Sequence, residues 1–182
     1  RIDGPLENDS SATIRVESQR GTGVSVLTID QAFQNHGRIE LTHLSSNTGA
    51  NGQSRLNVPQ GLNIAAGGKL ISNGPGQLLN AAVVNAGEFS VTGGILQVLN
   101  SNRIFRALDG TLDIGGPAKL RVSGGETQLG TGLTLSGLGV LDLTGDHTLS
   151  LQSDVTFEAS DPQLEFGGEV VVNGPGRLSI AR

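Results

Sequence analysis

The residues best suited to chemistry in this chain are four aspartates that form two similarly spaced pairs: Asp109, Asp113, Asp142 and Asp146. Asp113 and Asp142 each lie between two apolar residues, in the related segments GTLDI (110–114) and GVLDL (139–143). If these segments are neighbouring strands in register, the two carboxylates lie about 5 Å apart. Carboxylates at that distance repel each other unless a cation bridges them. The pattern therefore suggests either a Ca²⁺ site or an acid and a base that cleave a glycosidic bond.

The same residues also have a plain structural interpretation. An aspartate on the outer face of a strand is simply solvated, and Asp109-Gly110 is a common turn pair. Arg103 and Arg106 alternate with apolar residues, so they either clamp the carboxylate of a uronate or face water.

Aromatic residues and histidines add little support for an enzyme. The chain has no Trp and no Tyr, so only Phe is available to stack on a sugar ring, and we expect Phe89 and Phe157 to point into the core. His36, His43 and His147 have no partner at metal-ligand spacing and are expected in turns and at the surface. The residues therefore favour a non-catalytic protein, with a polysaccharide lyase or hydrolase as the alternative.

The longest polar insertion, THLSSNTGANGQS (42–54), is the predicted binding loop. Loops carried by a rigid scaffold often hold the binding residues, so we predict a contact surface made by Asn47, Thr48, Asn51 and Gln53. The alternative is a tolerated insertion without a partner.

A degenerate repeat must position all of these residues. The pattern Gly-x-apolar-x-apolar recurs with a mean spacing of 26 residues, centred on Ile14, Ile39, Leu70, Phe89, Leu112, Leu141 and Val170. Such spacing is typical of solenoids and propellers. Each copy is followed by two further short apolar alternations separated by turns, and no segment has helical periodicity.

The repeat predicts an all-β chain, a single-stranded parallel β-helix (β-solenoid) with about seven three-strand coils, and the general rule for parallel crossovers makes it right-handed. The solenoid is expected over residues 11–182, with 1–10 as an N-terminal cap or linker. The two Asn-Gly-Pro-Gly turns, at 73–76 and 173–176, are predicted to be the same corner of two coils.

The predicted register also pairs individual side chains. Arg15 and Glu40 become stacked neighbours that form an ion pair. Asn35 and Asn85 precede equivalent repeats, and we expect them to form hydrogen bonds along the stack.

The segments FQNHGRIELT, VVNAGEFSVTGG and ALDGTLDIGG resemble the Asn-x-Gly-x-apolar-x-apolar repeats of bacterial autotransporter and two-partner-secretion (filamentous-haemagglutinin-like) passenger proteins. The resemblance covers residues 11–181. It implies a right-handed β-helix, in agreement with the general handedness of parallel crossovers. It also implies an excerpt of a longer secreted chain, located outside the cell or on the bacterial surface. The function would be that of an adhesin-like extracellular-matrix scaffold that contacts a host or matrix glycan or protein.

Composition and charge narrow the choice of partners. The net charge is −5, with Lys and Arg scattered singly, which argues against nucleic acid. No apolar stretch reaches the length of a membrane span, and the chain has no Cys. No cofactor is expected except possible Ca²⁺. Open strand edges at the ends of a β-coil stack favour pairing, so end-to-end self-association into a filament is a further alternative.

Overall fold

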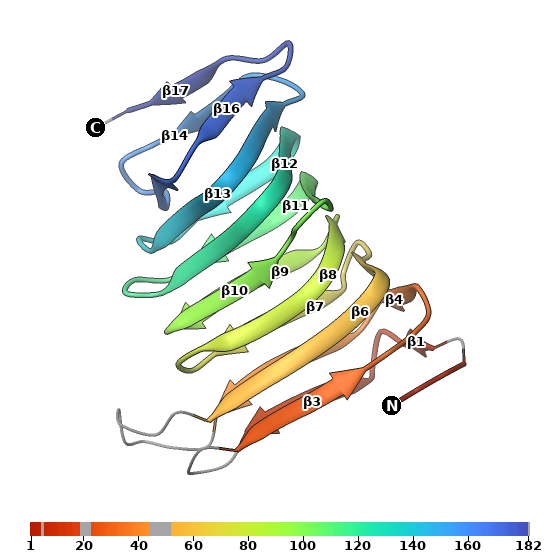
Figure 1. The fold of residues 1–182 in the computed structure, drawn as a ribbon. Coiled ribbons are helices and arrows are strands. Elements are labelled where there is room, and N and C mark those ends of the chain that lie inside the picture. The colour runs from red at the N-terminus through yellow and green to blue at the C-terminus, as the bar shows by residue number, and fades with distance from the viewer. Residues whose placement is uncertain (5, 19–22, 44–51, 182) are drawn as a thin grey trace.

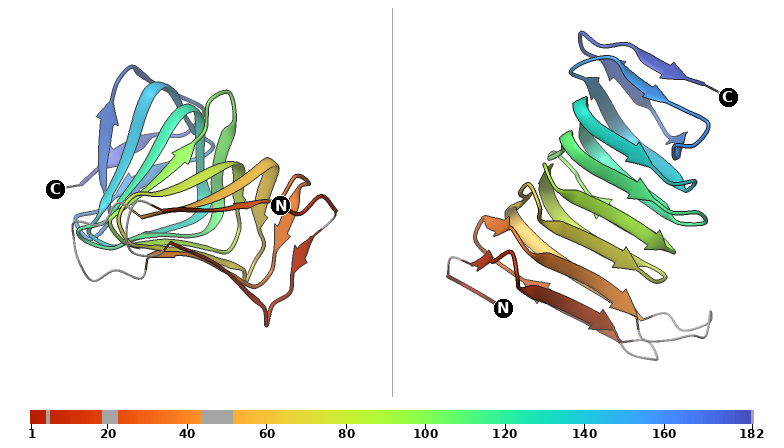
Figure 2. Two further views of the ribbon diagram at one scale, coloured as in Figure 1. Left: turned by 60° about the horizontal axis from the view of Figure 1, so that its bottom comes forward. Right: turned by 180° about the vertical axis from the view of Figure 1, so that it is seen from behind.

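The computed structural model describes residues 1–4, 6–18, 23–43 and 52–181. These residues form an all-β solenoid of about seven turns in which parallel strands stack along one axis (Figure 1). The described residues contain no helix, and hence no helix that could cross a membrane. Figure 2 shows the two termini at opposite ends of the stack.

The strands are β1 (Glu7–Asn8), β2 (Thr13–Ser18), β3 (Val24–Thr28), β4 (Phe33–Asn35), β5 (Arg38–His43), β6 (Gln53–Ile64), β7 (Lys69–Asn73), β8 (Gln77–Asn85), β9 (Glu88–Gly93), β10 (Ile95–Leu99), β11 (Ile104–Ile114), β12 (Lys119–Ser136), β13 (Val140–Leu151), β14 (Val155–Phe157), β15 (Gln163–Gly167), β16 (Val170–Asn173) and β17 (Leu178–Ile180).

Three parallel ladders form the three faces of the solenoid. Face A contains β2, β5, β7, β9, the end of β11 and the end of β12. Face B contains β3, the first parts of β6 and β8, β10, the first parts of β12 and β13, and β15. Face C contains β1, β4, the second parts of β6 and β8, the start of β11, the middle of β12, the second part of β13, and β16. Strands β14 and β17 form a separate parallel pair.

The glycine that opens each repeat is explained by a close approach between coils. At the corner from face C to face A, Gly37, Gly68, Gly87 and Gly110 follow one another up the stack. A Cβ atom at any of them would lie 2.1–2.2 Å from a carbonyl oxygen of the preceding coil. Of these four, only Gly110 has a left-handed φ, +75°. The glycines are therefore required chiefly by space.

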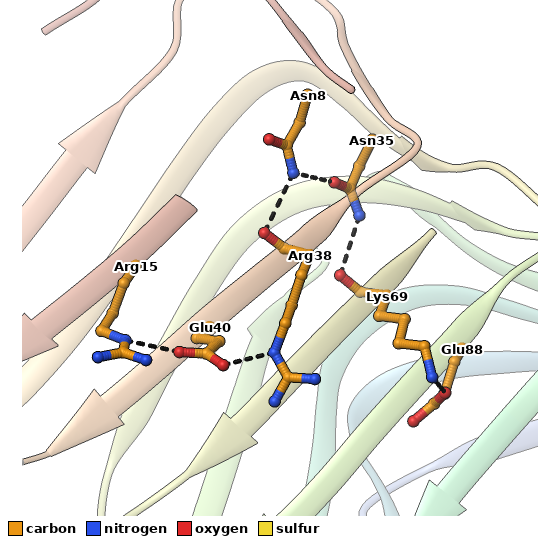
Figure 3. A network of polar contacts seen from close by, with 7 residues as sticks. All are labelled: Asn8, Arg15, Asn35, Arg38, Glu40, Lys69 and Glu88. Atoms are coloured by element: carbon orange, nitrogen blue, oxygen red, sulfur yellow. Dashed lines mark hydrogen bonds and ion pairs between the residues drawn. The ribbon is translucent and has the colours of Figure 1, made fainter. Parts of the chain in front are cut away.

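Asparagines fasten the same corners (Figure 3). Buried Asn8 donates from Nδ2 to Oδ1 of Asn35 at 2.7 Å, and Asn35 donates to the carbonyl oxygen of Lys69 at 3.0 Å. Asn85 lies in the same column as Asn35, two coils further on, with Ile64 between them. It donates to the carbonyl oxygen of Thr111 at 3.0 Å. The prediction that Asn35 and Asn85 form hydrogen bonds along the stack is confirmed.

Aliphatic side chains and three buried phenylalanines fill the interior. Phe33, Phe89 and Phe105 are among the largest fully enclosed side chains. The rings of Phe89 and Phe105 meet edge to face, with centroids 5.3 Å apart, an arrangement that aromatic pairs prefer. Phe89 and Phe157 both point into the core, as predicted.

The register differs from the predicted one beyond Leu112. The first five repeat centres, from Ile14 to Leu112, do stack on face A. However, Leu112 pairs with Leu135, whereas Leu141 lies on face B. The strand that contains Leu135 carries its apolar residues at the first and third positions after Gly132, whereas the repeat has them at the second and fourth, so the repeat pattern passes over it.

The two Asn-Gly-Pro-Gly turns are different corners, and the prediction that they are equivalent is wrong. The first, at 73–76, connects β7 on face A with β8 on face B, whereas the second, at 173–176, connects β16 on face C with β17. Gly74 and Gly174 have φ of +127° and +108°. A tight turn built on such a glycine suits any corner of the solenoid, whichever two faces it connects.

His147 is a buried polar residue of the inner column, and the prediction of a turn or surface position is wrong for it. The side chain is 3% exposed, and its Nε2 lies 2.9 Å from Oγ1 of Thr127. Burial lowers the pKa of the imidazole, and this effect is only partly opposed by the hydrogen bond to the backbone of Gly124 and the charge of Glu126. The neutral imidazole is thus part of the folded core.

We predict that Gly87→Ala destabilises the protein by about 2 to 3 kcal/mol, because its new methyl group would meet backbone oxygens of Gly68 and Ala65. The matched control is Gly23→Ala, where no atom lies within 4 Å and φ is ordinary. That control should leave stability unchanged or slightly raised. Urea unfolding followed by circular dichroism measures both. Equal stability of the two variants would contradict the close-approach explanation.

We predict that His147 makes the fold less stable as pH falls. Its pKa is lower in the folded than in the unfolded chain, so protonation favours unfolding from about pH 6.5 downward, until the folded pKa is reached. His147→Gln should lose less stability than the wild type between pH 7.5 and 5.5, as measured by urea midpoints. The same loss in both proteins would show that His147 is not responsible.

Candidate functional site

Asp113 and Asp142 lie on different faces, so the prediction that they stack one coil apart is wrong. Asp113 belongs to face A and Asp142 to face B. The physical reason is the strand ending at Ser136, which occupies the position above Asp113 that the repeat had given to Asp142. The two carboxylates therefore do not form the predicted acid-base pair or a shared cation site.

The Asp113 carboxylate is held between two hydroxyl groups of its own column. Ser90 Oγ donates to Oδ2 and Ser136 Oγ donates to Oδ1, both at 2.9 Å. These bonds connect three consecutive coils on the outer surface of face A.

Asp142 is almost fully enclosed by cationic side chains. Its side chain is 6% exposed, and Oδ2 lies 2.8 Å from Nε of Arg121 and 3.8 Å from Nζ of Lys119. Lys119 also pairs with Glu165 at 2.8 Å. A carboxylate buried in this way requires its cationic partners, which indicates a structural role on face B.

Asp109 and Asp146 are both exposed, at two further corners. Asp109 lies opposite Gly132 where face C meets face A, and Asp146 lies where face B meets face C. The four aspartates are thus spread around the solenoid. Within the part of the chain that the structure describes, no three His, Cys, Asp or Glu side chains are grouped to hold a metal ion.

Arg103 and Arg106 are each anchored by an amide of another coil. Arg103 Nη1 donates to Oδ1 of Asn80 at 2.6 Å, and Arg106 Nε donates to Oε1 of Gln128 at 2.8 Å. Gln128 in turn donates to Glu126 at 2.9 Å. Both guanidinium groups therefore already have partners within the solenoid, and neither contacts Asp113 or Asp142.

Ion pairs cover the first coils of face A (Figure 3). Arg15 Nε lies 2.6 Å from Oε2 of Glu40, as the predicted register requires, and Arg38 pairs with the other oxygen of Glu40. The hydrogen bond from Arg38, together with Arg15, holds the pKa of Glu40 below its usual value despite burial. Lys69 and Glu88 form the next pair at 2.6 Å.

Most of the predicted binding loop lies outside the described residues, namely Asn47, Thr48 and Asn51. Gln53 begins β6, and its Oε1 accepts a hydrogen bond from Arg55 at 3.3 Å. The proposed contact surface on this loop remains a prediction.

A groove on the outside of face C was not identified from the sequence. Its volume is about 530 Å³, within the range of ligand-binding clefts, and it crosses β1, β4, β6 and β8. The residues that line it are Leu6, Glu7, Ala32, Phe33, Gln34, Gln60, Gly61, Leu62, Asn63, Ala82 and Val84.

Amide side chains supply most of the hydrogen-bonding groups of this groove. Glu7, Gln34, Asn63 and Val84 form one outward column, so successive side chains are separated by about one strand spacing. Among the described residues, no side-chain hydrogen bond connects Gln34, Gln60 or Asn63 to another part of the chain. These amides are therefore available to a ligand.

The groove could not be found from the repeat alone. The repeat aligns the strands of face A, whereas the groove depends on which residues of face C lie above one another. The useful signal is a small residue two positions before an amide, Ala32 before Gln34 and Gly61 before Asn63, and it becomes visible only once the coils are registered.

Comparison of the chain with models of protein families, with curated proteins and with solved structures found no match. The function is therefore inferred from the fold and from the chemistry of its surface.

Proposed function

We propose that this protein is a non-catalytic, adhesin-like scaffold, secreted or held on a bacterial surface, that presents a polar binding surface from a rigid shaft. The observation that carries the proposal is the groove on face C, whose amides form no side-chain hydrogen bond within the described residues and whose strands belong to a continuous ladder. The partner would be a host or matrix glycan or protein.

The ladder makes this surface rigid before any ligand arrives. β6 and β8 share seven paired positions and bend around a corner without ending. The backbone of such strands loses little conformational freedom on binding, and this preorganisation favours affinity. The repeats that resemble secreted passenger proteins support the proposed location outside the cell.

A polysaccharide lyase or hydrolase is the weaker candidate on geometric grounds. Glycosidases place their two carboxyl groups on either side of one bond, roughly 5 to 9.5 Å apart. Asp113 and Asp142 project from different faces, and each already has partners within the solenoid.

We predict that the protein releases no soluble products from polysaccharides. The test is incubation with acidic and neutral polysaccharides, with Ca²⁺ or with chelator, followed by mass spectrometry. New oligosaccharides that disappear in Asp113→Asn or Asp142→Asn would contradict the proposal and identify an enzyme.

Self-assembly into a filament is a second candidate, favoured by the exposed core of the last coil. Three buried columns end there in side chains that are 44–53% exposed: Phe166 above Leu143, Val172 above Leu149 and Ile180 above Phe157. Such an apolar surface can pair with a further β-coil, either of a longer chain or of a second copy.

For this candidate we predict that the mass measured by light scattering rises with protein concentration. The variant Val172→Asp/Ile180→Asp should remain monomeric, because it places charges in the apolar end. The matched control, Val171→Asp, changes an outward neighbour that is already 52% exposed and should still associate. A constant mass of the wild type at all concentrations would eliminate the filament.

A further inference from the structure

We infer that the groove on face C binds an uncharged glycan chain that lies along the solenoid axis. The inference rests on the proposed binding function and assigns its ligand class and its site. Four observations support it: the type of polar group, the local charge, the orientation of the groove, and the contrast with the rest of the same column.

The polar groups of the groove match hydroxyl groups. Gln34, Gln60 and Asn63 each carry an amide that both donates and accepts hydrogen bonds. A sugar hydroxyl also does both, so each amide can bind it in either sense. Between the amides, Ala32, Ala82 and Val84 provide a small apolar floor against which the C–H face of a sugar ring can pack.

The charge of the groove disfavours an anionic polymer. Glu7 is the only charged side chain among the described residues that line it. A uronate or a sulfated sugar would bring a second negative charge to a site without a cation. Arg106, the next member of the column after Val84, is bound to Gln128 and does not line the groove.

The orientation of the groove favours a chain that crosses coils. At Gln34, Asn63 and Val84 it lies on the face of the sheet, where β4, β6 and β8 pair in register with neighbouring strands. An extended peptide that adds a strand needs a free edge, whereas a ligand on the paired face meets chiefly side chains. Because Gln34 and Asn63 come from consecutive coils, a ligand that contacts both runs along the axis.

Beyond Val84, the outward column of the groove continues with polar side chains that bond to one another. Arg106 is bonded to Gln128, and Ser150 donates to Asn173 at 2.8 Å. Polar groups there satisfy one another. The opening is confined to the column between β1 and β8, which indicates a defined site.

The test is affinity electrophoresis through native gels that contain a neutral β-glucan, a galactomannan, or polygalacturonate. We expect retardation by at least one neutral polymer and none by polygalacturonate. The variant Gln34→Ala/Asn63→Ala should bind at least tenfold more weakly, because it loses several hydrogen bonds to hydroxyl groups. The control Gln97→Ala removes an outward amide of face B, bonded to Ser123, and should bind like the wild type. Urea midpoints establish that all variants are folded.

The other outcomes separate this inference from the proposed function. Binding to a neutral polymer that is unaffected by Gln34→Ala/Asn63→Ala would overturn the site but leave a binding scaffold. Retardation by polygalacturonate alone, or binding to an immobilised peptide library alone, would overturn the ligand class. Binding to none of these polymers would overturn the inference. Product release, measured separately, would overturn the scaffold itself.

Discussion

Every part of this structure depends on one distance, the spacing of about 4.8 Å at which hydrogen-bonded strands stack. All three faces must keep it in every coil, including at the corners, where the backbone leaves the regular strand geometry. The corners meet this demand with two residue types. Glycines such as Gly87 let one coil pass against the carbonyl groups of the coil below, and asparagines such as Asn35 bond across the gap. The apolar columns can stack only because the corners close to the same distance.

This dependence explains which parts of the fold could be predicted from the sequence. Gly37 and Gly87 mark the starts of the strands that follow them, because the carbonyl groups of the preceding coil leave no room for a side chain there. The strands, the coils and the absence of helix in the described residues could therefore be predicted from the repeat alone. The assignment of strands to faces was not, because corners between different faces use the same residues. The strand at Gly132–Ser136 lacks the usual phase, so the predicted register gave its place on face A to Leu141, which lies on face B.

The same assignment of a strand to the wrong face produced the predicted pair of Asp113 and Asp142. Asp113 and Asp142 looked like neighbours because their local sequences are alike, but a likeness between segments identifies a strand without identifying its face. Their environments, two serines for one and Arg121 with Lys119 for the other, depend on side chains more than twenty residues away. The groove on face C has the same origin. Gln34 and Asn63 are unremarkable in the sequence, and only the stacking of β4 on β6 brings them together.

The direction of the hydrogen bonds has a mechanical consequence. In each ladder the bonds between coils run parallel to the long axis of the solenoid, so a force that pulls its two ends apart acts on one coil at a time. Coils in the middle of the stack contain 23 residues, and one such coil would release about 75 Å of extended chain in place of a rise of about 4.8 Å. A shaft that resists bending would thus lengthen stepwise under tension, and could absorb a sudden load at one end before the coils that carry the groove begin to open.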